Sequence, residues 1–187
     1  MIIDINETVL AIDPSINSSG VALFKKHKLI AADTIKADHK YTDIAERCFY
    51  MGALIIDWAI TTNHAVVTCM AVEWPQIHVH GSNDRNDLLG LAGVNMSAIA
   101  GVAMLMANAP TVPFKVCSYL PSEWACQTKK TKAKPMLSPR ALYIQRRLGI
   151  SEQLVWKHLS HDAIDAIGIG LHHLGRMKPK RVFPGAS

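Results

Sequence analysis

Two apolar runs near the start of the chain are separated by a segment rich in turn-forming residues, and the first run ends on a carboxylate. The sequence reads VLAID, then PSINSSG, then VALF over residues 9–24. Apolar runs of this length around Pro, Asn, Ser and Gly predict two strands joined by a turn. Asp13 therefore ends a strand whose other residues are typical of a buried core. It either opens the turn by bonding to nearby backbone amides or serves a site at the edge of a sheet.

The rest of the chain alternates strands with helices. Strands are predicted from short apolar runs over residues 8–12, 20–25, 28–36, 65–72 and 114–118, the first three as an antiparallel meander. Helices are predicted from apolar residues at helical spacing over residues 41–62, 86–108, 121–126, 139–148 and 160–177. This order favours one α/β domain over residues 1–187, with a mixed sheet and helices on both faces. Residues 178–187 are interpreted as a flexible basic tail.

The helix expected over residues 86–108 is apolar nearly all round and about as long as a membrane span. Asn95 and Ser97 interrupt it, and its flanks carry no anchoring pattern. We therefore expect no membrane segment, and instead a helix buried in a soluble protein, partly against a second subunit. Small residues are expected where two backbones pass closely, at Gly90, Gly93, Ala98 and Gly101.

Positive charge is concentrated in the second part of the chain. The sequence has 20 Lys and Arg against 15 Asp and Glu, for a net charge of +5. Residues 1–114 contain 7 basic and 11 acidic residues, whereas residues 115–187 contain 13 basic and 4 acidic residues. A single basic cluster fits a solvated loop, but several clusters in one region favour a nucleic-acid partner.

The four cysteines are scattered and form no CxxC pair, and no secretory signal opens the sequence. Three of the cysteines lie in apolar runs, where a small buried thiol is common. A reducing cytoplasm is the expected location.

Acidic residues mark the ends of two predicted strands and the start of the last helix. Asp13 ends the first strand and Glu73 the fourth, while Asp162 and Asp165 lie three residues apart on one helix face. Acids at a helix N-terminus are also common because the helix dipole favours them. A mixed sheet brings all four to one edge, where they repel each other unless cations are bound. The pattern predicts a two-metal site with Mg²⁺ or Mn²⁺ for hydrolysis at phosphorus.

Three segments in order along the chain resemble the motifs of RuvC-type Holliday junction resolvases: IDPSINSSGVAL, AVEWPQ and HDAIDAIGIGLHH. The likeness extends from Val9 to His173 and includes the order of strands and helices. It implies an RNase H-like fold with a mixed five-stranded sheet. The segment LPSEWACQTKKTKAK further resembles phage-encoded members, which implies a phage protein acting in the cytoplasm of a bacterial host.

The resemblance also implies roles for individual residues. Asp13 bridges two Mg²⁺ ions, Glu73 binds one of them, and Asp162 and Asp165 bind at the other, with Mn²⁺ able to substitute. His161 orients water or phosphate. The helix over residues 87–108 forms a homodimer interface. DNA phosphates are contacted by basic residues of the loop and the following helix, namely Lys129, Lys130, Lys132, Lys134 and Arg140.

Trp74 departs from the family pattern. The family often places an aromatic wedge shortly after the glutamate, whereas here Trp74 is adjacent to Glu73 and residues 76–80 read QIHVH. Trp74 is therefore interpreted as either a DNA contact or a packing residue.

The implied function is a metal-dependent endodeoxyribonuclease that resolves four-way DNA junctions by symmetric nicking. Three alternatives remain from the sequence. In the first, the chain is a nuclease of the same fold that acts on flaps, forks or RNA–DNA hybrids. In the second, the chain binds junctions without cutting them. The third, a sugar-kinase-like nucleotide site, requires a second domain for which 187 residues leave little room.

Overall fold

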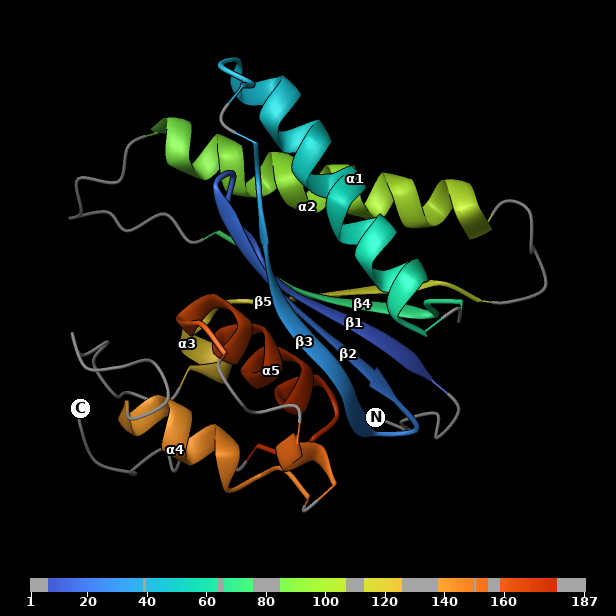
Figure 1. Cartoon of the computed structure of the whole chain (residues 1–187), viewed down its shortest axis with the longest axis vertical. Coiled ribbons are helices and arrows are strands. Elements are labelled where there is room, and N and C mark those ends of the chain that lie inside the picture. Colours follow the sequence, from blue (N-terminus) through green and yellow to red (C-terminus); the bar gives the residue numbers. More distant parts are fainter. Residues whose placement is uncertain are drawn as a thin grey trace, which may run out of the picture.

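The structure, a computed structural model, describes residues 7–38, 40–63, 66–75, 85–106, 113–125, 138–149, 151–154 and 159–177. A five-stranded sheet of order β3-β2-β1-β4-β5 forms its centre (Figure 1). The strands are β1 (Thr8–Asp13), β2 (Ser18–Lys25), β3 (Lys28–Lys36), β4 (Cys69–Glu73) and β5 (Lys115–Tyr119). The first three form an antiparallel meander, and β4 and β5 run parallel to β1. The predicted mixed sheet is confirmed.

Helices cover both faces of the sheet, as predicted. Helices α1 (Ile44–Asn63) and α2 (Arg85–Met106) lie on one face (Figure 1). The other face carries α3 (Pro121–Trp124), α4 (Pro139–Gln145), a short 3-10 helix (Glu152–Leu154) and α5 (His161–His173). Strand β4 begins four residues later than expected, because its ladder with β1 starts where Cys69 pairs with Val9.

Side chains of the central strands alternate between two cores. On β1, Leu10 and Ile12 pack with residues of α1 and α2, whereas Val9 and Ala11 pack with residues of α5. Strand β4 alternates in the same way. The sheet is therefore buried on both faces at its centre, which explains the continuous apolar runs in the sequence.

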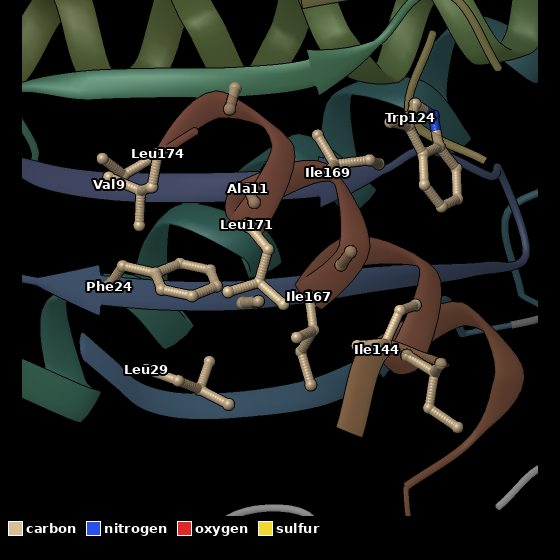
Figure 2. Close-up of a cluster of buried hydrophobic side chains, with 14 of the residues drawn as sticks. Val9, Ala11, Phe24, Leu29, Trp124, Ile144, Ile167, Ile169, Leu171 and Leu174 are labelled. Carbon is tan, nitrogen blue, oxygen red and sulfur yellow. The ribbon is translucent and has the colours of Figure 1, made fainter. Parts of the chain in front are cut away.

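Helix α5 lies across the sheet, and its Leu171 side chain lies beside Phe24 in the core cluster (Figure 2). Its start is capped by Ser160, whose Oγ accepts a hydrogen bond from the Ala163 amide at 3.2 Å. Its end is a Schellman turn: Gly175 has a φ of 66°, and the Arg176 amide donates to the Leu171 carbonyl at 2.8 Å. The helix consequently ends at His173, four residues before the expected end.

The small residues of α2 pack within the chain, Gly90 against Ile16 and Gly93 and Gly101 against α1, so their expected placement between two copies is corrected. A Cβ on Gly93 would lie 2.7 Å from Cys48 Sγ, and one on Gly101 would lie 3.1 Å from Ile56. Ala98 is fully buried. The local pattern indicated close helix packing correctly, but the partner helix comes from the same chain.

The outward face of α2 carries large apolar side chains. Leu89, Met96 and Met104 are 66%, 56% and 74% exposed. Among the described residues, Leu88–Met106 is the one helical stretch long and apolar enough to cross a membrane by length and composition, and 28% of it is buried inside the structure. Core helices of soluble proteins meet the same two criteria.

Candidate active site

Asp13 and Glu73 end neighbouring parallel strands. In the β1–β4 ladder Ile12 pairs with Val72, so the two acids occupy the next position on each strand. The residues two positions before each acid pack with α5. Because side chains alternate along a strand, Asp13 and Glu73 project toward the α5 face, on strands spaced about 4.8 Å apart.

Asp162 reaches this edge because α5 begins directly against β2. Gly20 pairs with Asp13 across the β1–β2 ladder. A Cβ on Gly20 would overlap the backbone carbonyl of Asp162, so glycine is required for this close approach. The Ser18 hydroxyl donates to Asp162 Oδ2 at 2.8 Å and orients the carboxylate. The end of β1 and the start of α5 are thus separated by the backbone of one glycine.

Asp165 lies one helical turn further on and is 4% exposed. Arg140 of α4 donates from Nη1 to both of its carboxylate oxygens, at 2.9 and 2.8 Å. The Arg140 guanidinium lies over the Trp124 ring, 5.4 Å from its centroid. A buried carboxylate is costly unless a cation or hydrogen-bond donors compensate it, and Arg140 supplies both to Asp165.

Glu73 is fixed by two residues whose role the sequence did not indicate. Trp124 Nε1 donates to Glu73 Oε2 at 2.8 Å, and the buried Asn95 of α2 donates from Nδ2 to the Glu73 backbone carbonyl at 2.8 Å. The sequence identified Asn95 only as an interruption of an apolar helix. Its polarity at a fully buried position was the available signal, because a buried amide requires a hydrogen-bond partner.

Of the remaining predicted site residues, the structure describes His161 and Trp74 but not the four lysines. His161 begins α5, next to Asp162. Trp74 is 36% exposed, and its amide donates to the Tyr119 carbonyl at 2.8 Å, which places it at the same sheet edge. Four predicted DNA contacts, Lys129, Lys130, Lys132 and Lys134, lie outside the described residues.

The four acids offer the oxygen ligands that Mg²⁺ prefers, and their donor set fits that ion. Glu73, Asp162 and Asp165 are each held by a donor, namely Trp124, Ser18 and Arg140. Across the part of the chain that the structure describes, the one group of three His, Cys, Asp or Glu ligand atoms within 4.8 Å of one another is a different set, Cys69, Cys117 and His173. Asp13, Glu73 and the start of α5 therefore lie at one sheet edge, but no three carboxylates among the described residues lie within 4.8 Å of one another.

The fold is shared with solved Holliday junction resolvases. Thermus thermophilus RuvC in complex with a Holliday junction substrate has a TM-score of 0.55 at 15% identity, over 92% of this chain and 99% of that chain. A further structure of T. thermophilus RuvC has a TM-score of 0.51 at 15% identity, with the same coverage. The yeast mitochondrial resolvase Ydc2 has a TM-score of 0.53 at 14% identity, over 89% of this chain and 78% of that chain. No protein-family model and no curated protein matches the sequence.

Proposed function

We propose that the chain is a RuvC-type, metal-dependent endodeoxyribonuclease that resolves four-way DNA junctions by symmetric nicking. The observation that supports it most is that Asp13 and Glu73 end neighbouring strands while α5, which carries Asp162 and Asp165, begins directly against Gly20. The fold adds support, because a neighbour with the same fold has been solved on a Holliday junction. Fold alone hosts many functions, so the acids carry the chemical part of the proposal. A single domain, a phage origin and a bacterial cytoplasm remain predictions.

The proposed role of Asp13 follows from its position between two other acids. Asp13 would hold both metal ions, because it lies beside Glu73 on one side and, across Gly20, beside Asp162 on the other. Two Mg²⁺ ions, with Mn²⁺ as a substitute, would supply a water of lowered pKa and Lewis acidity for hydrolysis at phosphorus. Arg140 and a metal ion would share the carboxylate oxygens of Asp165, because each oxygen that accepts a hydrogen bond keeps a second lone pair. The other N–H groups of the guanidinium would be the donors for a DNA phosphate.

Cleavage of defined DNA substrates tests this proposal. A labelled four-way junction, a flap, a linear duplex and an RNA–DNA hybrid are incubated with the protein, each with and without Mg²⁺. We expect cutting of the junction only with Mg²⁺, and little cutting of the others. Equal cutting of flaps would identify a debranching nuclease instead. Junction binding without cutting in Mg²⁺ or Mn²⁺ would identify a silent binding protein.

A homodimer through α2 is part of the proposal. Leu89, Met96 and Met104 form an exposed apolar face on the side of α2 away from the core, and contiguous faces of this kind mark interfaces. A second copy is the partner we propose, because paired nicking of a four-way junction requires two sites related by a two-fold axis.

Replacing Met96 by Glu is expected to yield a monomer at micromolar concentration. A charge without a partner in an interface costs about 3–5 kcal/mol, which weakens association by more than about 100-fold. Light scattering measures the mass. The control is Leu142→Glu, the same kind of change at an exposed position on the opposite face of the sheet, which should stay dimeric. A wild-type protein that is monomeric at tens of micromolar contradicts the dimer.

Changing Lys130, Lys132 and Lys134 together to Ala is expected to weaken junction binding and flatten its salt dependence. Each lost phosphate contact removes the release of about one counterion, so the slope should fall by up to about three. Affinities measured across a salt series give the slope. Lys25→Ala with Lys28→Ala is the control, because this pair lies at the far end of β2 from Ser18. An unchanged slope in the triple variant would show that these lysines are solvated and do not contact DNA phosphates.

A further inference from the structure

A second cluster of metal-ligating side chains lies at the opposite end of the parallel strands from the acids. Glu7 precedes β1, Cys69 begins β4, Cys117 lies within β5, and His173 is the last residue of α5. The ligand atoms of the two cysteines and the histidine all lie within 4.8 Å of one another. Along α5, His173 is roughly 16 Å from Asp162, so this cluster is separate from the proposed active site.

The imidazole of His173 is oriented by contacts at both ring nitrogens. Its Nδ1 lies 2.8 Å from the Tyr119 hydroxyl, while its Nε2 lies 3.2 Å from Glu7 Oε2 and 3.5 Å from Cys69 Sγ. A ring that donates from Nδ1 to Tyr119 presents the Nε2 lone pair to the carboxylate and the thiol. Metal-binding histidines are commonly anchored in this way through their second nitrogen.

Burial sets these groups apart from ordinary surface residues. The side chains of His173 and Glu7 are 5% and 8% exposed, and Cys69 is fully buried. Cys117 is partly exposed, and Glu7 joins the group through its contact with His173. A carboxylate, an imidazole and one thiol are therefore buried together, where each polar atom needs a partner.

The register of β4 and β5 favours a shared ion over a disulfide. Cys69 pairs with Lys115, so Cys117 lies two residues further along the neighbouring strand on the same face. Strand spacing and rise place the two Cα atoms about 8 Å apart. Disulfides require Cα atoms within about 7 Å, so the bond cannot form without movement of the backbone. Two thiolates on one tetrahedral zinc are about 3.8 Å apart, a separation within the range seen here.

We propose that Cys69, Cys117, His173 and Glu7 form a tetrahedral site for a thiophilic divalent cation such as Zn²⁺, with Tyr119 anchoring the histidine. Two thiols, one imidazole and one carboxylate make a ligand set that Zn²⁺ accepts, whereas Mg²⁺ prefers oxygen ligands alone. Binding forms two metal–sulfur bonds and releases the two thiol protons to water. The ion would join the segment before β1 to β4, β5 and the end of α5.

Titration of the full chain with Co²⁺ after treatment with a chelator tests this site. We expect one equivalent to bind with a sulfur-to-cobalt charge-transfer band, and Zn²⁺ but not Mg²⁺ to displace it. Cys117→Ser should lose the band, and this partly exposed position tolerates the change. Tyr119→Phe should weaken binding by about 10–100-fold, as loss of a partner to a ligating histidine does.

Cys48, a buried cysteine of α1 on the opposite face of the sheet, supplies the matched control. Cys48→Ser should keep the band and the affinity of the wild-type protein. Zn²⁺ should also raise the thermal unfolding temperature of the wild-type chain and not that of Cys117→Ser, a readout independent of DNA cleavage. Absence of stoichiometric binding, equal affinity in Cys117→Ser, or loss of the band in Cys48→Ser would each overturn the proposal.

Discussion

Replacing Asp13 by Asn is expected to abolish junction cleavage while leaving junction binding largely intact. Asp13 lies between Glu73 and, across Gly20, Asp162, so this change removes the proposed bridging charge without altering the size of the side chain. The basic residues proposed to contact DNA remain. We expect the single-turnover rate to fall at least about 10³-fold, equivalent to about 4 kcal/mol of transition-state stabilisation. Glu73→Gln should also abolish cleavage, because it removes a carboxylate charge from the site. Its amide oxygen still accepts a hydrogen bond from Trp124, so the fold should be kept.

The matched control is Asp57→Asn, which removes an exposed carboxylate of α1 on the opposite face of the sheet. It should cut and bind like the wild-type protein. An Asp13→Asn variant that keeps a tenth or more of the cleavage rate would remove Asp13 from the site.

Replacing Gly20 by Ala is expected to destabilise the fold and, with it, the active site. The added Cβ would overlap the backbone carbonyl of Asp162, and neither backbone can rotate away as a side chain can. Helix α5 must therefore shift on β2 and weaken the contact between Ser18 and Asp162. Overpacking of this kind costs about 3 kcal/mol or more, which for a chain of this size lowers the unfolding temperature by roughly 6–12 °C.

Thermal unfolding followed by circular dichroism measures this effect. Gly101→Ala on α2 is the control, because its Cβ would meet only the flexible side chain of Ile56 at 3.1 Å and alanine favours a helix. It should unfold within a few degrees of the wild-type protein. Wild-type unfolding and cleavage by Gly20→Ala would show that the close approach of α5 to β2 is not required.

The sequence was sufficient to predict the sheet and the position of two acids. Apolar runs that end on Asp13 and Glu73 show where buried strands reach an edge, and this signal is local. The parallel pairing that makes the two acids neighbours followed from the alternation of strands and helices. The structure bears out both features of the fold.

Contacts between distant residues left no such signal. The pairing of Arg140 with Asp165 was not predicted, and Trp124 fixes Glu73 from 51 positions away. The cysteines looked scattered, yet strand register brings Cys69 and Cys117 to one face. The small residues of α2 illustrate the limit. Their local pattern indicates that the helix packs closely, but only the fold determines which element it packs against.

Junction resolution itself is tested most directly with a supercoiled plasmid that extrudes a cruciform. The first nick releases the supercoiling that maintains the cruciform, so linear product requires both strands to be cut in one binding event. With Mg²⁺ we predict linear DNA as the main product of the wild-type protein, and none without Mg²⁺ or with Asp13→Asn. Accumulation of open circles alone, or equal cutting of a plasmid without the inverted repeat, would contradict a dimeric junction-resolving nuclease.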